Sequence, residues 1–253
     1  MSNFVGFATL VKREFKRTLM IINQVVWPPV ITTLLFLFIF GVGLGAAVPT
    51  MNGVRYILFL LPGLVMLNVI SSSYDESSSS LFQQRFQMSI QELLIAPLSE
   101  LELLLGYLVG SILRGLAIGA LVIAIGLIVL HATPQNGWVL FFMFVTSLLF
   151  SSIGMIAGLL AKTFDNLAIL TTFVITPLTY VGGVFTSIHA LPALIQKISL
   201  FNPMLYMIDG LRFGYIGRSD VSPWVDGAVV SVLAVAAFIV AYLMVKKGVN
   251  LRV

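Results

Sequence analysis

Residues 103–130 read LLLGYLVGSILRGLAIGALVIAIGLIVL, an apolar run that carries a single charge, Arg114. About 20 such residues form a helix that crosses the hydrocarbon core of a bilayer, so this stretch predicts a transmembrane helix long enough to tilt or to project. The whole chain agrees, because 59% of its 253 residues are hydrophobic and only 9% are charged. Soluble domains are far less apolar and far more charged. The sequence therefore predicts an all-α integral membrane protein of one domain, 1–253, rather than a soluble enzyme.

Five further apolar stretches are long enough to span a membrane, and none shows the alternating pattern of a membrane barrel. They are residues 25–45, 56–73, 138–160, 167–188 and 225–245. Residues 1–24 before them carry an apolar side at steps of three and four, with basic residues on the other side. The apolar side is Phe4, Phe7, Val11, Phe15, Leu19 and Ile22, and the basic residues are Lys12, Arg13, Lys16 and Arg17. This pattern predicts an amphipathic helix that lies in the membrane interface.

Six spans place both termini on one side of the membrane, and the basic residues indicate which side. The terminal side holds nine Lys and Arg residues: Lys12, Arg13, Lys16, Arg17, Arg85, Lys162, Lys246, Lys247 and Arg252. The other side holds four: Arg55, Lys197, Arg212 and Arg218. Cytoplasmic loops carry the excess of basic residues, so both termini are expected in the cytoplasm. Basic residues that flank spans also argue against nucleic-acid binding.

The expected cytoplasmic loop between spans two and three, residues 74–102, contains two Ser-x-x-Glu capping boxes, Ser89–Glu92 and Ser99–Glu102. Pro97 separates them and ends the first helix, which predicts a short helix over Ile90–Ala96. This helix is apolar and has an acidic rim. It is either a docking site for a cytosolic partner or a surface helix that packs back on its own bundle.

Arg114 is predicted to be the one charge deep in a span. Such a charge faces the bundle interior or water, where it lines a substrate route or braces the bundle. The alternative is a snorkelling side chain or a static hydrogen bond to Asn68 or to the serines of 71–73. Ser111, Gly115 and Gly119 form a face of small residues beside it, which favours close helix packing.

The fifth span is interrupted by Thr176-Pro177 and by Gly182-Gly183, which free backbone groups inside the helix. The outer segment that follows, residues 189–224, is apolar but is broken by Pro192 and Pro203. It is either a re-entrant helical hairpin in the outer leaflet or an amphipathic cap on the bundle, and the sequence leaves both open.

Several kinds of chemistry are not expected in this chain. The absence of Cys excludes disulfides and thiol catalysis. The nearest match to a phosphate-binding loop, Gly158–Thr163, has Ala161 in place of its second glycine, so no nucleotide hydrolysis is expected here. No cofactor or metal is expected either. All acidic residues are expected outside the spans or at their ends, which disfavours a proton-coupled secondary transporter.

The order and spacing of several short strings resemble the type-2 permeases of ABC transporters. The strings are Glu92-Leu-Leu-Ile-Ala-Pro97, Gly106-Tyr107, Arg114-Gly115, Ala161–Asp165, Thr176-Pro177 through Tyr180 and Gly182-Gly183 to Phe185, and Asn202-Pro203 with Tyr206 and Arg212. The match runs through nearly the whole chain. It is nearest to the YadH-type bacterial permeases, which are related to the NodJ and DrrB exporters.

The resemblance implies the membrane subunit of an exporter in the bacterial inner membrane. Two copies would pair, and two separate ABC ATPase subunits would hold ATP and magnesium. The region 85–98 would couple to the ATPase through Arg85, Glu92, Leu93, Leu94, Ile95, Ala96 and Pro97. The substrate path or bundle interior would include Arg114, Pro177, Tyr180, Gly182 and Gly183.

The family's substrates include amphipathic, lipid-like and glycan molecules. A heteromeric partner permease, a non-transporting structural subunit and a secondary transporter stay open as alternatives.

Overall fold

Six helices in the described part of the chain are long and apolar enough to cross a membrane, as the six apolar stretches predict. The computed structural model describes residues 4–43 and 50–251. The six helical segments are Ile22–Gly41, Tyr56–Phe86, Glu100–Leu130, Trp138–Leu160, Phe164–Val184 and Pro223–Lys246. The all-α membrane fold is therefore confirmed.

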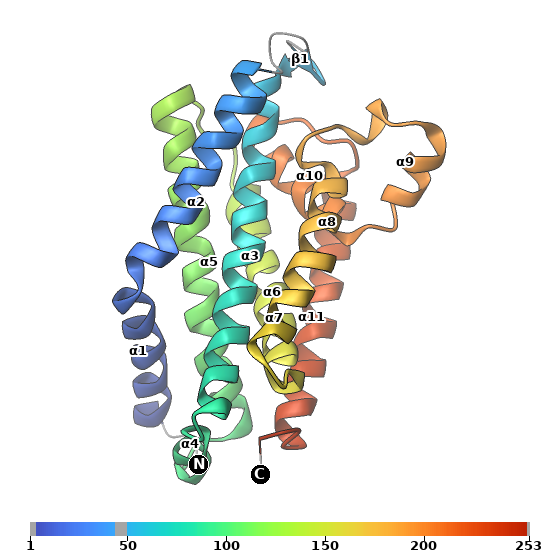
Figure 1. Cartoon of the computed structure of the whole chain (residues 1–253). Coiled ribbons are helices and arrows are strands. Elements are labelled where there is room, and N and C mark those ends of the chain that lie inside the picture. The colour runs from blue at the N-terminus through green and yellow to red at the C-terminus, as the bar shows by residue number, and fades with distance from the viewer. Residues whose placement is uncertain (1–3, 44–49, 252–253) are drawn as a thin grey trace.

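The elements follow one another in a simple up-and-down order (Figure 1). The first part of the chain forms α1 (Phe4–Met20), α2 (Ile22–Phe36), the π-helical turns of η1 (Leu37–Gly43), β1 (Thr50–Met51), β2 (Val54–Arg55), α3 (Tyr56–Phe86), α4 (Ile90–Ile95), α5 (Glu100–Leu130) and α6 (Trp138–Leu160). The second part forms α7 (Phe164–Leu170), η3 (Thr171–Ile175), α8 (Thr176–Thr179), η4 (Tyr180–Val184), η5 (Ile188–Ala190), α9 (Ala193–Ser199), α10 (Pro203–Ile216) and α11 (Pro223–Lys246). Strands β1 and β2 pair antiparallel as a small hairpin.

One end of the bundle carries the start of α1, all of α4 and the end of α11 (Figure 1). We call it the terminal end, and the end that carries the β hairpin the opposite end. Both chain termini thus lie at the same end, as an even number of spans requires. The predicted cytoplasmic location of that end stays a prediction.

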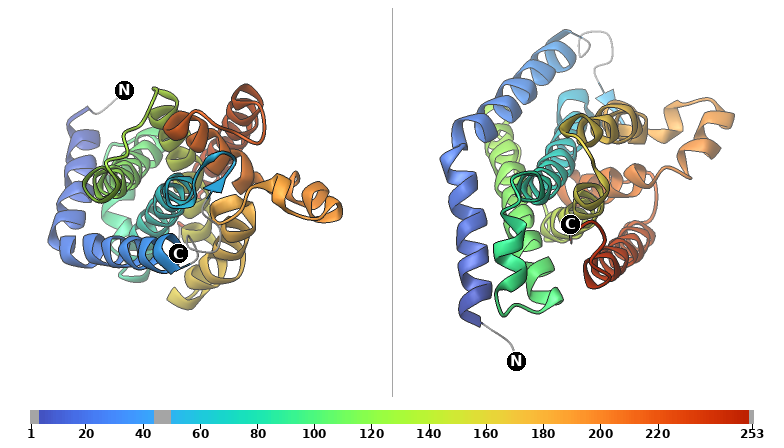
Figure 2. Two further views of the ribbon diagram at one scale, coloured as in Figure 1. Left: turned by 90° about the horizontal axis from the view of Figure 1, so that it is seen from above. Right: turned by 60° about the horizontal axis from the view of Figure 1, so that its bottom comes forward.

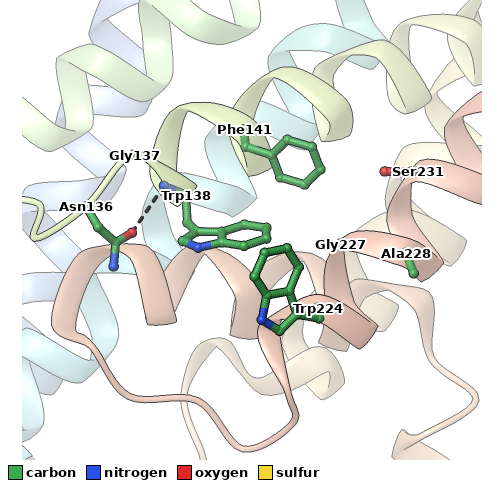
Figure 3. Close-up of a pocket in the computed structure, with 8 residues that line it drawn as sticks. All are labelled: Asn136, Gly137, Trp138, Phe141, Trp224, Gly227, Ala228 and Ser231. Atoms are coloured by element: carbon green, nitrogen blue, oxygen red, sulfur yellow. Dashed lines mark hydrogen bonds between the residues drawn. The ribbon is translucent and has the colours of Figure 1, made fainter.

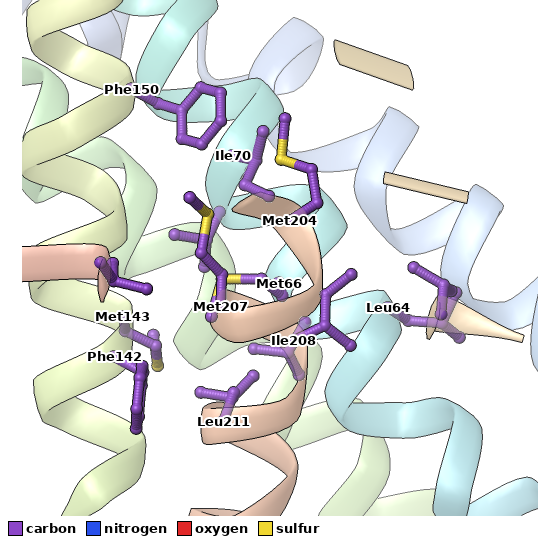
Figure 4. Packing of buried hydrophobic residues seen from close by; sticks show 14 of the residues in the cluster. Leu64, Met66, Ile70, Phe142, Met143, Phe150, Met204, Met207, Ile208 and Leu211 are labelled. Carbon is purple, nitrogen blue, oxygen red and sulfur yellow. The ribbon is translucent and has the colours of Figure 1, made fainter. Parts of the chain in front are cut away.

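Helix α3 is the central element of the bundle and packs mainly against α5 and α6. Its residues 59–66 are buried throughout, and its apolar side chains meet those of α6 and α10 in one core (Figure 4). The core residues drawn include Leu64, Met66, Ile70, Phe142, Met143, Phe150, Met204, Met207, Ile208 and Leu211. Burial of these side chains supplies the main packing energy between the helices.

The second span is longer than predicted, because α3 continues through the expected loop to Phe86. The expected loop began at residue 74, so the serines 77–80 were placed outside the span, and serine competes with the helix backbone for hydrogen bonds. Here the hydroxyl of Ser77 donates to the Ser73 carbonyl at 3.2 Å within the helix. The small serines also let α6 approach, since a side chain at Gly154 would collide with Ser77. A polar string therefore serves as a close-packing face.

Helix α1 runs along α5 instead of standing apart from the bundle (Figure 2). Gly106 and Gly110 of α5 form the contact surface for α1. A side chain at Gly106 would collide with Leu10, and one at Gly110 with Glu14. The helical character of the N-terminal segment agrees with its amphipathic pattern. Its predicted location in the membrane interface stays a prediction.

The outer segment divides into two parts with different surroundings. Helix α10 is buried against α3, α6 and α11, with Asp209 and Arg212 fully enclosed. Helix α9 stands away from the bundle (Figure 1), and Leu194, Ile198 and Phe201 near it are exposed. The re-entrant placement of this segment in a membrane stays a prediction.

Candidate functional site

Helix α4 presents an apolar edge at the terminal end of the bundle. Ile90 is buried, and Leu93 packs against the cluster around Leu10 and Leu104. Leu94 and Ile95 point outward, with exposed fractions of 40% and 85%. Of the three apolar residues expected to face a partner, Leu93 therefore anchors α4 to the bundle, and Leu94 and Ile95 form the free edge.

Of the two predicted capping boxes, one forms and one does not. Ser99 accepts from the Glu102 amide at 3.2 Å, and the Glu102 carboxylate accepts from the Ser99 amide at 2.8 Å. Ser89 is already in a helical conformation, and its hydroxyl instead donates to the Gln84 carbonyl at 3.3 Å. The prediction of a Ser89–Glu92 box is therefore wrong. An N-cap residue has non-helical backbone angles, whereas those of Ser89 are helical. The side chain of Glu92 is exposed.

The link from α4 to α5 is short and geometrically fixed. Ala96 is extended, with φ −67° and ψ 146°, as the residue before a proline must be. Pro97 has a fixed φ, Leu98 packs on the same cluster as Leu93, and the Ser99 box then starts α5. A displacement of α4 is therefore transmitted to α5 through few adjustable torsions.

Arg85, expected in the coupling region, holds the terminal end of the bundle together. Its guanidinium donates to the carbonyls of Gly158 and Ala161 at the end of α6. It also donates to the Asn250 carbonyl at 2.9 Å. A cation at a helix C-terminus satisfies carbonyls that have no partner within the helix. Arg85 thus joins the end of α3, just before α4, to the end of α6 and to the segment after α11.

Aromatic residues that the sequence did not single out extend the apolar surface next to α4. Phe86 and Phe164 are exposed, and together with Phe82 their rings pack at centroid distances of 4.7 to 6.0 Å. A hollow of about 310 Å³ lies beside them, lined among others by Phe86, Met88 and Lys162. All three phenylalanines lie outside the predicted spans 56–73, 138–160 and 167–188, so no local pattern in the sequence marks them as a cluster.

Arg114 is not a lone charge, which corrects the sequence prediction. Its guanidinium forms an ion pair with Glu76 of α3. Glu76 also accepts from Arg17 at 2.6 Å and from the Thr18 hydroxyl at 2.9 Å. Asn68, the suggested partner, donates instead to the Leu64 carbonyl at 2.8 Å. Because α3 continues to Phe86, Glu76 is a buried acid inside a helix, and the expectation that acids avoid the spans is wrong for it.

A second buried acid, Glu14 of α1, extends this network. It accepts from Arg13 at 2.8 Å and from the Ser80 hydroxyl, and it lies 3.5 Å from Arg17. Three guanidinium groups therefore face these two carboxylates, and a third acid, Asp75, lines the same hollow as Arg114. The network ties α1, α3 and α5 together, and paired charges are the form in which buried charges are tolerated. Glu76 was missed because Arg17 and Arg114 are distant from it in the sequence. Glu14 could have been found from its local pairing with Arg13 and Arg17.

The interrupted fifth span contains π-helical turns on both sides of Pro177. Gly183 has φ +100°, a conformation that L side chains rarely adopt. Gly182 touches α10, because a side chain there would collide with Met204. Pro177 and Tyr180 are exposed, and the Tyr180 ring packs edge-on against Phe185 with centroids 5.4 Å apart.

An ion pair on α10 holds this interruption in place. The guanidinium of Arg212 donates to the Gly183 carbonyl, lies 3.4 Å from Asp209 and sits 3.8 Å from the centre of the Phe59 ring. Asp209 accepts from the amides of Asp220 and Val221 at 2.8 Å. Burial raises the pKa of the Asp209 carboxyl, and the Arg212 charge acts in the opposite direction. The sequence signal that could have found this pair is the i, i+3 spacing of its charges.

The structure does not bring all the predicted path residues together. Arg114 lines two hollows, and neither is lined by Pro177, Tyr180, Gly182 or Gly183. Within the described residues, no group of three or more His, Cys, Asp or Glu side chains is placed to hold a metal.

A hollow of about 750 Å³ lies between α6 and α11 near their opposite-end termini (Figure 3). Trp138 and Trp224 meet edge to face in it, with ring centroids 4.9 Å apart. Asn136 accepts from the Trp138 amide at 3.1 Å and so starts α6. Tryptophans at the ends of spans are typical of the membrane–water interface, which favours a lipid-facing role for this hollow.

The fold and these features define a multi-pass helical membrane protein, with an apolar edge at one end and a broken span at the other. The sequence model of the ABC-2 type transporter matches residues 5–216. The chain therefore belongs to the ABC-2 type transporter family. It is similar to the inner membrane transport permease YadH of Escherichia coli K12, with 39% identity over 98% of both chains.

Nodulation protein J of Rhizobium leguminosarum biovar viciae is also similar, at 26% identity over 84% of this chain and 83% of that protein. Nodulation protein J of Rhizobium meliloti shares 29% identity over 71% of this chain and 69% of that protein. The resemblance found in the sequence is therefore confirmed at the level of family and relatives.

Proposed function

We propose that this chain is the membrane subunit of an ATP-driven exporter in the bacterial inner membrane. The observation that carries the proposal is the family membership over 5–216, combined with an exposed apolar helix edge at the end where both termini lie. ATP and magnesium are held by a separate ABC ATPase, which docks against Leu94 and Ile95 of α4. Both termini and α4 face the cytoplasm in this proposal.

The force enters through α4 and reaches α5 along a short path. Docking displaces α4, and the fixed conformation at Ala96-Pro97 transmits the displacement to the capped start of α5. Since α5 is joined to α1 and α3 through the Arg114–Glu76–Arg17 network, the three helices move as a unit. Arg114 thus braces the moving bundle, and Arg85 keeps the ends of α3 and α6 in register.

A second copy of the chain covers the exposed apolar faces of α2 and of the broken fifth span. Ile31 and Phe38 on α2 are exposed, as are Phe173 and Val181 on the fifth span. The substrate is an amphipathic, lipid-like or glycan molecule that moves outward between the two copies. Pro177 and Tyr180, which are exposed, line that path. Gly182 and Gly183 are buried against α10, where the irregular backbone is tolerated because it is enclosed by protein.

The experiment is purification of the tagged chain together with its ABC ATPase, followed by ATP hydrolysis in lipid bilayers with and without candidate substrates. The Leu94→Ala, Ile95→Ala double variant removes the free edge and leaves Leu93 in place. We expect it to insert and pair normally but to recruit less ATPase, since a central contact is worth about 2 kcal/mol or more.

The matched control is Ile128→Ala with Leu140→Ala, an apolar pair at the opposite end that is also exposed. The control should keep full recruitment and hydrolysis. Equal recruitment by both double variants would remove α4 as the docking element. A chain that never co-purifies with an ATPase would favour the structural-subunit alternative.

A further inference from the structure

Asp226, in the first turn of α11, is a buried acid that the proposed transport mechanism does not use. Its side chain is fully enclosed, and neither carboxylate oxygen has a hydrogen-bond partner among the described residues. An isolated carboxylate that is removed from water costs far more free energy than a neutral carboxylic acid. The start of a helix favours a negative charge through its free amides, but no described amide donates to Asp226.

Two further acids lie near Asp226, and both are compensated where Asp226 is not. Asp209 and Asp220 each repel a negative charge at Asp226. Asp209 pairs with Arg212 and accepts from two backbone amides of the loop between α10 and α11. Asp220 accepts from donors of the β hairpin and of the outer segment, which are the Asn52 side chain, the Ser187 hydroxyl and the Ile188 amide. Of the three acids, Asp226 is therefore the one that holds a proton.

Within the described ranges, no cation compensates Asp226. The Arg212 guanidinium donates to the Gly183 carbonyl, and Arg218 is exposed. Helix α6 and residues 115–130 of α5 carry no ionisable side chain, and neither do residues 44–49. The hydroxyls of the two α10 tyrosines, Tyr206 and Tyr215, donate to the carbonyls of Leu200 and Ala132.

We propose that Asp226 is a proton-binding site, and that its neutral carboxylic acid keeps the loop between α10 and α11 attached to the β hairpin and to the end of the fifth span. Release of the proton leaves a carboxylate at Asp226, which repels the charges of Asp209 and Asp220. Asp209 holds the loop through the amides of Asp220 and Val221, and Asp220 holds the hairpin through Asn52, so this repulsion loosens the opposite end of the bundle. The proposal concerns this chain alone and does not depend on the exporter assignment.

The first test is infrared spectroscopy of the purified full-length chain in lipid bilayers. A protonated carboxylic acid has a carbonyl stretch that a carboxylate lacks. We expect the unaltered chain to show this band at neutral pH and Asp226→Asn to lose intensity in it. Asp165→Asn, at an exposed acid of α7, is the control and should keep the full band. A spectrum of Asp226→Asn identical to that of the unaltered chain overturns the proposal.

The second test is thermal unfolding in detergent between about pH 5 and about pH 9. An ordinary aspartate releases its proton at about pH 4, so the unfolded chain binds fewer protons than the folded chain and is favoured as the pH rises. The Asn side chain cannot ionise. We therefore expect the unfolding temperature of the unaltered chain to fall relative to that of Asp226→Asn by about 3 °C per pH unit.

The matched control removes both exposed histidines, as His131→Gln with His189→Gln, and should follow the unaltered chain. At alkaline pH, deuterium exchange over residues 217–222 should be faster in the unaltered chain than in Asp226→Asn, because the loop has loosened. A temperature difference between the unaltered chain and Asp226→Asn that does not change with pH overturns the proposal, and so does equal exchange of the loop.

Discussion

Glu76 accepts from both Arg17 and Arg114, so the three side chains do not contribute equally to stability. Removal of Glu76 takes the ion-pair partner from Arg114 and leaves Arg17 with the more distant Glu14, so we expect Glu76→Ala to destabilise the folded chain by about 3–5 kcal/mol. Arg114→Leu leaves Glu76 paired with Arg17 and Thr18, so it should destabilise the chain less and still fold. Thermal unfolding in detergent measures both variants.

The double variant Glu76→Leu with Arg114→Leu provides the internal check. It should be more stable than Glu76→Ala, because replacing a buried pair by apolar residues removes desolvation as well as attraction. Glu92→Ala, at an exposed acid on α4, should leave the unfolding temperature unchanged. A Glu76→Ala variant as stable as Glu92→Ala would contradict the network.

Arg212 is fully buried and serves three partners at once: the Gly183 carbonyl, Asp209 and the face of Phe59. Arg212→Lys keeps the charge but loses the planar, many-donor head, so it is not a conservative change here. We expect a loss of about 2–3 kcal/mol in unfolding free energy, since a buried carbonyl and a buried carboxylate lose partners. Arg218→Lys, at an exposed position, is the matched control, and equal stability of the two variants would contradict this role.

At the level of elements, the close approach of α3 and α6 depends on small residues. Gly154→Leu should separate the two helices, because its side chain would collide with Ser77 and with the Tyr74 carbonyl. We expect loss of the folded, monodisperse protein on size-exclusion chromatography. Gly137→Leu has open space around it and should behave as the unaltered chain does. A well-folded Gly154→Leu variant would show that the serine face is not a packing surface.

The sequence predicted six spans because a bilayer imposes long apolar runs, and it predicted the Ser99–Glu102 box because a cap is a local pattern. It placed the end of α3 too early because the apolar run ends at residue 73, whereas the polar residues that follow continue the helix and pack on α6. The contacts of Arg114 with Glu76 and of Arg212 with Gly183 could not be read from local pattern, since these partners are distant in the chain. The sequence also indicated an apolar helix before Pro97, but only the structure shows that Leu93 packs inward while Leu94 and Ile95 are exposed. The coupling role of this helix stays a prediction.

At the scale of the whole molecule, the exposed apolar faces of α2 and the fifth span predict how two copies meet. The chain has no cysteine, so single cysteines can be introduced without background. Ile31→Cys and Phe173→Cys should each crosslink two copies in membranes. Val232→Cys and Ile239→Cys on α11 are also exposed but lie outside the proposed interface, and they should not crosslink. Crosslinking through α11 alone would place the interface elsewhere.

The central claim is that an ATP-hydrolysing partner drives this chain through α4. The most direct measurement is photo-crosslinking from a photo-reactive label attached to a single cysteine at position 95. The same label on a single cysteine at position 194 on α9 is the comparison, and mass spectrometry identifies the captured protein. We predict that Ile95→Cys captures an ABC ATPase and that Leu194→Cys does not, although both positions are exposed. Capture of the ATPase from other terminal-end positions, but never from Ile95→Cys or its neighbour Leu94→Cys, would contradict the account.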